Sequence, residues 1–146
     1  MINKIITLHG TGLRSMGSLD CEGEALVTTQ PITFLGFVDR KTGKIVEKNH
    51  ELNGQTLKNK IFVFPKGIGS TVAPYVLVNL KKNNVAPIAI INRESDSGTV
   101  AGASTSRIPM VYRLDQDPTK IIQTGNWVRI SIISGSATIE VIPKPN

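Results

Sequence analysis

The stretch Phe64-Pro65-Lys66-Gly67-Ile68-Gly69-Ser70-Thr71-Val72 decides the fold of this chain. It follows an apolar segment, residues 61–64, that predicts a buried strand, and it leads into a helical pattern over residues 72–82. Two glycines allow a sharp bend, and the Ser-Thr pair suits a helix cap. The N-terminus of a helix favours an anion, because its first N–H groups lack partners. The stretch is therefore either an ordinary strand-to-helix turn or the site of an activated hydroxyl, Ser70.

Three better-known loops of this kind are excluded by the sequence itself. The Gly-Lys-Ser/Thr ending of a Walker phosphate loop is missing. The third glycine of a dinucleotide-binding fingerprint does not occur at the required spacing. No Gly-x-Ser-x-Gly of a nucleophile elbow is present either.

The segments around this stretch predict a β-rich α/β domain. Val72, Val76 and Leu80 repeat at helical spacing, and an apolar strand is expected over residues 87–91. The small residues of 97–106 predict a short helix that packs closely on its neighbours. Further strands are expected at residues 2–8, 25–29, 108–112, 127–133 and 138–141, the last two joined by a hairpin at 134–136.

Length and composition indicate one globular domain spanning residues 1–146. The hydrophobic fraction of 40% is ordinary for a globular protein, and no apolar run is long enough to cross a bilayer. No signal peptide precedes the first predicted strand. The single cysteine, Cys21, excludes an internal disulfide and a cysteine-rich metal site. We expect a cytoplasmic protein that has no membrane partner and binds no metal itself.

The net charge of +6 raises the question of nucleic acid. The lysines and arginines lie mostly in turns and form no run of five or six. Only four Phe, two Tyr and one Trp are available for base stacking. The charge is better explained by solubility and by steering of an anionic ligand or an acidic partner, so no nucleic-acid partner is expected. A non-enzymatic module that binds through its basic surface remains a rival interpretation.

Seven segments in order resemble one family over residues 4–142. This family is the aconitase X group, and the resemblance is to its small, swivelling subunit. It implies a single swivelling β/β/α domain, similar to the C-terminal domain of aconitase. The segments are GEALV (23–27), PITFLG (31–36), NHELNG (49–54), FPKGIGSTV (64–72), YVL (75–77), APIAI (86–90) and IPMV (108–111).

Within that group, residues 69–72 and 75–77 are most similar to archaeal members that dehydrate (R)-5-phosphomevalonate to trans-anhydromevalonate 5-phosphate, a step of isoprenoid biosynthesis. The resemblance implies a lyase in which a large partner subunit carries an iron–sulfur cluster and binds most of the substrate. This chain would bind no cofactor and would be inactive alone. Its contribution would be a catalytic serine, Ser70, acting as general base. The alternative within the group is the small subunit of a hydroxyproline dehydratase.

The remaining site residues follow from the same loop. Gly69 is expected to contact substrate, Thr71 either donates to substrate or caps the helix, and Gly67 is expected to shape the loop. Relatives often have a basic residue where this chain has Ile68, so Lys66 is the candidate for a contact to the substrate phosphate. Two acids further along, Glu94 and Asp96, belong either to the site or to a solvated loop face.

Overall fold

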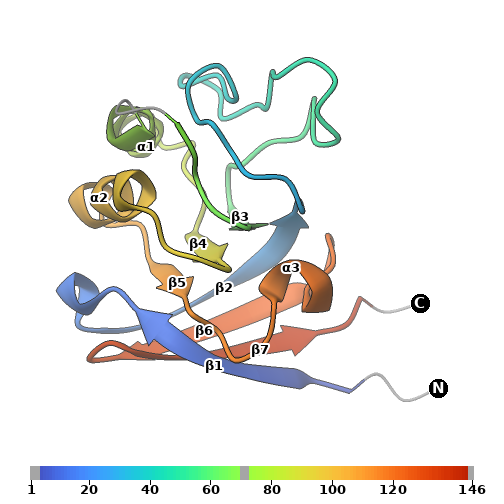
Figure 1. The fold of residues 1–146 in the computed structure, drawn as a ribbon, viewed down its shortest axis with the longest axis vertical. Helices are drawn as coiled ribbons and strands as arrows, with labels where there is room; N and C mark the ends of the chain where they lie inside the picture. Colours follow the sequence, from blue (N-terminus) through green and yellow to red (C-terminus); the bar gives the residue numbers. More distant parts are fainter. Residues whose placement is uncertain (1–3, 70–72, 145–146) are drawn as a thin grey trace.

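The computed structural model describes residues 4–69 and 73–144, so the predicted site residues Ser70 and Thr71 lie outside the described residues. In the described ranges, seven strands close into a barrel in the order β1-β5-β4-β3-β2-β6-β7 (Figure 1). Their bounds are β1 (Ile6–Gly12), β2 (Ser18–Val27), β3 (Lys60–Phe64), β4 (Ala89–Asn92), β5 (Met110–Tyr112), β6 (Trp127–Ile133) and β7 (Ser136–Ile142). The helices are η1 (Arg14–Met16), α1 (Ala73–Lys82), α2 (Ser97–Ser106) and α3 (Pro118–Ile121).

The barrel combines a parallel half with an antiparallel half. Strands β2, β3, β4 and β5 run parallel to one another, and α1 and α2 connect β3 to β4 and β4 to β5. The other four neighbouring pairs are antiparallel. Strands β6 and β7 form the predicted hairpin, in which Ser134 and Gly135 both have positive φ, as a type I′ turn requires. The α/β, strand-rich fold predicted from the sequence is confirmed.

Two hydrophobic cores follow from the alternation of side chains along the strands. On β3, Ile61 and Val63 point into the barrel, where buried side chains from every strand meet. Phe62 and Phe64 point the other way, toward α1, α2 and the long loop at residues 28–59. All four side chains are fully buried, which explains why the segment reads as continuously apolar.

The loop at residues 28–59 contributes half of an aromatic cluster. Phe34 lies edge-on to Phe64 with ring centroids 5.7 Å apart, and Phe37 stacks on Phe62 at 6.0 Å. These are all four phenylalanines of the chain. In Figure 1 the loop lies beside α1, on the side of β3 that faces away from the barrel. The cluster therefore fixes the start of the loop against the strand that leads to the site.

Helices α1 and α2 lie side by side (Figure 1), and a glycine allows their close approach. A Cβ atom on Gly102 would lie 2.7 Å from Leu77 Cδ1 and 2.9 Å from Pro74 Cα. The small residues of α2 are thus a packing surface, as predicted. The observed bounds of α2, Ser97–Ser106, match the predicted range.

The first two strands differ from their predicted positions. Strand β1 begins at Ile6 and ends at Gly12, whereas residues 2–8 were expected; residues 2 and 3 lie outside the described ranges. Strand β2 covers Ser18–Val27, most of which reads as a polar stretch. Asp20, Glu22 and Glu24 lie on the solvent-exposed face of the strand. These acidic residues make the segment appear polar, so its alternation of buried and exposed positions is not evident from the sequence. No helix within residues 4–69 and 73–144 has the length and apolar character to cross a membrane.

Candidate functional site

The loop at residues 65–69 follows β3 and is tied to the segment that follows β4. The carbonyl oxygen of Pro65 accepts hydrogen bonds from the backbone N–H groups of Arg93, at 3.1 Å, and Glu94, at 3.0 Å. Because β3 and β4 are parallel, their carboxyl ends meet at one edge of the sheet, where ligands usually bind in α/β folds. The loop is thereby fixed at that edge.

On its other side, the loop pairs with Ile32 as a short parallel bridge. The N–H of Ile32 donates to the carbonyl oxygen of Lys66 at 3.0 Å, and the N–H of Ile68 donates to the carbonyl oxygen of Ile32 at 2.9 Å. The side chain of Ile32 is buried in the core beside the phenylalanine cluster. Burial of that side chain fixes the register of the pairing.

Asp96 fastens the middle of the loop to the first turn of α2. Its Oδ1 accepts from the N–H of Gly67 at 2.8 Å, and its Oδ2 accepts from the N–H and the hydroxyl of Thr99, each at 3.0 Å. Asp96 is the N-cap of α2. A Cβ atom on Gly67 would lie 2.6 Å from Thr99 Oγ1 and 3.0 Å from Asp96 Oδ2. A larger residue at position 67 would therefore collide with Thr99 and Asp96.

Gly69 turns the chain toward α1. Its φ of +85° lies in the left-handed region, which glycine adopts without the cost that a Cβ imposes. Gly69 is exposed and lies beside Thr33, whose methyl carbon would be 3.8 Å from an added Cβ. The turn thus occurs at the surface of the domain, next to the long loop.

An open pocket of about 450 Å³ lies where this loop meets the first turns of α1 and α2. Gly67 and Gly69, two of the predicted site residues, form part of its wall. Ser70 and Thr71 lie outside the described residues; in the chain they connect Gly69 to Ala73, which both line the pocket. The lining residues are Ile32, Gly67, Ile68, Gly69, Ala73, Pro74, Asp96, Ser97, Gly98 and Ala101.

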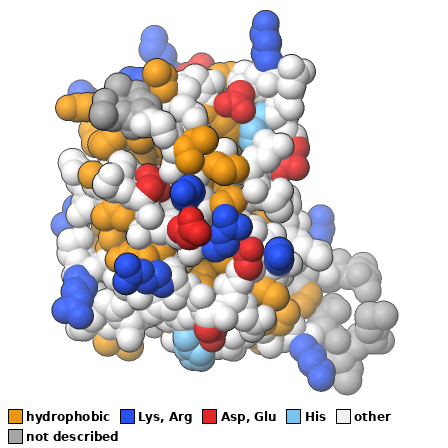
Figure 2. All heavy atoms as spheres, in the orientation of Figure 1, with side chains coloured by type: hydrophobic (Ala, Val, Ile, Leu, Met, Phe, Trp, Pro, Cys, Tyr) orange, Lys and Arg blue, Asp and Glu red, His pale blue; other side chains and the backbone are white. Residues whose placement is uncertain are grey.

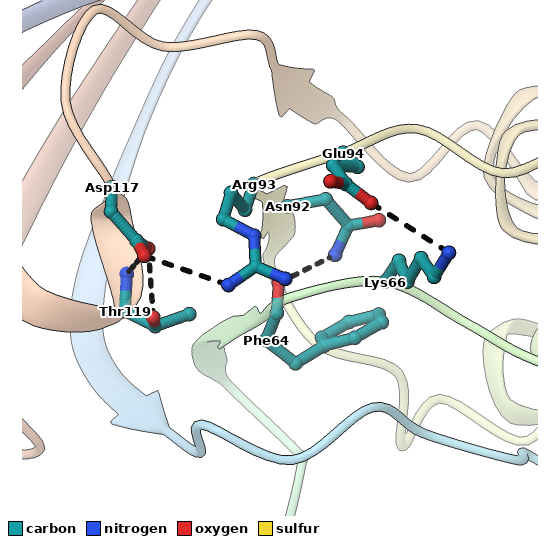
Figure 3. A network of polar contacts seen from close by, with 7 residues as sticks. All are labelled: Phe64, Lys66, Asn92, Arg93, Glu94, Asp117 and Thr119. Atoms are coloured by element: carbon teal, nitrogen blue, oxygen red, sulfur yellow. Dashed lines mark hydrogen bonds and ion pairs between the residues drawn. The ribbon is translucent and has the colours of Figure 1, made fainter.

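Lys66 belongs to a neighbouring polar network and does not line the pocket (Figure 3). Its Nζ lies 3.7 Å from Glu94 Oε2, and both side chains are half-exposed. On the other side of the network, Arg93 Nη1 lies 3.6 Å from Asp117 Oδ2. Glu94 is therefore the partner of Lys66 in this structure. Asp96, the second acid considered in the sequence analysis, lines the pocket.

Two members of the network are not apparent from local sequence. Asn92 is fully buried at the end of β4, and its Nδ2 donates to the carbonyl oxygen of Phe64 at 3.1 Å. Asp117 caps α3 by accepting from the N–H and hydroxyl of Thr119. Partial burial pushes the pKa of Asp117 upward, but the hydrogen bonds from Thr119 and the nearby charge of Arg93 outweigh it, so the pKa lies below its ordinary value.

A second hollow, of about 320 Å³, lies over β2, β6 and β7 and contains Cys21. Burial raises the pKa of the Cys21 thiol to about 11, and the neighbouring charges of Asp20 and Glu22 add to the shift. The thiolate, which is the form that binds iron, is therefore scarce at neutral pH. Within residues 4–69 and 73–144, no three His, Cys, Asp or Glu side chains are grouped so as to hold a metal ion.

Comparisons with known proteins agree on one family. A sequence model described as the aconitase X swivel domain matches residues 12–141. A phosphomevalonate dehydratase small subunit from Methanococcoides burtonii is 47% identical, over 78% of this chain and 83% of that protein. One from Methanosarcina mazei is 47% identical, over 75% of this chain and 76% of that protein. A crystal structure of Thermococcus kodakaraensis aconitase X, in its holo-form, superposes with a TM-score of 0.83 at 39% identity, covering 94% of this chain and 99% of that one.

Proposed function

Because this chain belongs to the aconitase X swivel domain family, we propose that it is the small subunit of a dehydratase that acts on (R)-5-phosphomevalonate. The product is trans-anhydromevalonate 5-phosphate, and a large subunit completes the site. The relatives named phosphomevalonate dehydratase small subunit support this substrate and this partner. We further propose that residues 1–146 act as one swivelling domain.

The observation that carries the proposal is the position of the loop at residues 65–69. It is held by backbone pairing on two sides and by Asp96, and it ends at the wall of an open pocket. The residues that follow Gly69 in the chain, Ser70 and Thr71, lead into α1. The described part of α1 begins at Ala73, and the N-terminal end of a helix carries unpaired N–H groups and the positive end of the dipole.

We assign Ser70 as the general base of the dehydration. The reaction removes a proton from the carbon beside the substrate carboxylate and a hydroxyl from the next carbon, and the two leave as water. A serine takes that proton as an alkoxide, which is poorly populated in water. Backbone donors and the dipole of α1 would stabilise the alkoxide once the large subunit excludes water from the pocket. Gly69 and Thr71 would contact the substrate.

The residues of this chain do not fit an iron–sulfur cluster. Such clusters are held by several thiolates, and this chain has one cysteine, Cys21. We therefore place the cluster, which would supply Lewis-acid assistance to the departing hydroxyl, on the large subunit. No residue of this chain is assigned to it.

The distribution of charge argues against the rival binding module. On the face in Figure 2, lysine and arginine side chains are spread from edge to edge with aspartate and glutamate between them. Nucleic-acid binding proteins instead gather positive charge along one stripe or patch. A dehydratase subunit would use the fixed position of residues 65–69 beside an open pocket. Binding through a general basic surface would not require that arrangement.

Substrate preference tests the proposal against the hydroxyproline alternative. The complex of this chain with its large subunit is expected to favour (R)-5-phosphomevalonate over hydroxyproline by about 10³-fold or more in kcat/KM, because a polar site left without its phosphate partner rejects the other substrate. Proton NMR of the reaction mixture would detect the vinylic proton of the product. Faster conversion of hydroxyproline would assign the chain to the alternative enzyme.

We propose that Lys66 leaves its ion pair with Glu94 and binds the substrate phosphate instead. Lys66→Ala is then expected to raise KM about tenfold with kcat within about twofold, as the loss of one charge-assisted hydrogen bond predicts. Lys81→Ala is the matched control, because Lys81 is an exposed lysine in the last turn of α1, the end away from the pocket. Equal KM values for the two variants would exclude a phosphate contact by Lys66.

A further inference from the structure

Asp96 supplies the one side-chain hydrogen bond that the backbone of residues 65–69 receives from the described part of the chain. The other ties to this loop run between backbone groups and come from Ile32, Arg93 and Glu94. The N–H groups of Arg93 and Glu94 would donate whatever their side chains are, and the pairing with Ile32 depends on that side chain only through its burial in the core. Asp96 differs because its side-chain atoms themselves hold the loop.

The contact is close-fitting on both sides. The N–H of Gly67 points directly at Asp96 Oδ1, and the space around the Cα of Gly67 is filled by the Asp96 carboxylate and the Thr99 hydroxyl. The carboxylate itself is held by two further hydrogen bonds from Thr99. Thr99 is fully buried in the first turn of α2. The position of the loop is therefore fixed relative to that helix.

We propose that Asp96 is a positioning residue for the dehydration: it fixes Gly67, and thereby the loop that carries Ser70, against α2 at the wall of the pocket. This inference rests on the proposed role of Ser70. Gly67 lies three positions before Ser70, and Gly69 between them has the conformational freedom of glycine. Without the hydrogen bond to Asp96, Gly67 would be held only through the backbone ties of its neighbours in the loop. A misplacement of about 1 Å costs about 10²-fold in rate.

The simpler explanation is that Asp96 only caps a helix. The chain contains a matched control for this explanation in Asp117, which caps α3 through the N–H and hydroxyl of Thr119, as Asp96 caps α2 through Thr99. Within residues 4–69 and 73–144, Asp117 forms its hydrogen bonds with Thr119 and its ion pair with the Arg93 side chain, forms neither with residues 65–69, and does not line the pocket. Replacing either aspartate by alanine removes a helix cap, but only the replacement of Asp96 also removes a hydrogen bond to residues 65–69.

The test uses the complex of this chain with its large subunit. Asp96→Ala is expected to lower kcat by about 10- to 100-fold with KM within about twofold, because substrate still binds while the base is misplaced. Asp117→Ala is expected to leave both within about twofold. Equal kcat values for the two variants would overturn the inference.

Two further variants separate anchoring from capping. Asp96→Asn keeps an oxygen that can accept from Gly67, so kcat is expected to recover to within about threefold of the wild type, although the amide nitrogen that replaces Oδ2 can accept neither of the hydrogen bonds from Thr99. Gly67→Ala breaks the same contact from the loop side and should lower kcat as Asp96→Ala does. The positioning role would be contradicted if Asp96→Asn did not recover kcat, or if Gly67→Ala kept the kcat of the wild type.

Amide hydrogen exchange of this chain gives a readout that does not depend on activity. In Asp96→Ala, the N–H of Gly67 should exchange faster while the N–H of Ile68, bonded to Ile32, stays protected. Unchanged protection at Gly67 would overturn the inference even if the rate fell. An inactive Ser70→Ala complex beside a fully active Asp96→Ala complex would refute this inference alone, whereas an active Ser70→Ala complex would refute the proposed function.

Discussion

Replacing Ser70 by alanine is expected to lower turnover of phosphomevalonate by about 10³-fold, the contribution of a positioned general base. The reason is that residues 65–69 offer no hydroxyl or carboxylate to take the proton: they are two glycines, an isoleucine, a proline and Lys66, which does not line the pocket. The complex should still assemble, because the substitution removes one oxygen atom. Steady-state kinetics and size-exclusion chromatography of the variant complex measure the two expectations separately.

Ser97→Ala is the control for this prediction. Ser97 lines the pocket and is the first residue of α2, but the cap of that helix is Asp96, so the Ser97 hydroxyl has no assigned role. Its removal should change kcat by less than about twofold. Normal turnover in Ser70→Ala, or an equal loss in both variants, would show that Ser70 is not the base.

The parts of the fold that local pattern predicts are those in which composition or the alternation of side chains is clear over the whole element. Helix α2 was predicted at its observed bounds, since small residues over ten positions favour a helix that packs closely. The hairpin of β6 and β7 was likewise expected, because both strands alternate clearly and meet at Ser134 and Gly135. Strand β2 was largely missed because its exposed face is acidic, and its pairing with β6 spans most of the chain.

The candidate site was predicted at the level of the loop but not of its supports. Lys66, Gly67 and Gly69 lie where the strand-to-helix pattern places them. The hydrogen bond from Gly67 to Asp96 joins positions 29 apart, and local sequence holds no signal for it beyond the cap pattern of Asp96 and Thr99. Pairing with Ile32 depends on the path of the loop at residues 28–59, which only its packed phenylalanines determine.

Activity of the large subunit should depend almost entirely on this chain. If the chain supplies the base and seals the pocket from water, then the large subunit alone lacks both, and its turnover should fall below that of the complex by about 10³-fold or more. This chain alone should be inactive as well, since its pocket is open and its single cysteine cannot hold a cluster.

The most direct measurement is a titration of the purified large subunit with this chain in the presence of (R)-5-phosphomevalonate, following the product by NMR. We predict that turnover rises from near zero and saturates at a fixed molar ratio of the two chains. Turnover by the large subunit alone that equals the rate of the mixture would contradict the claim that this chain completes the catalytic site.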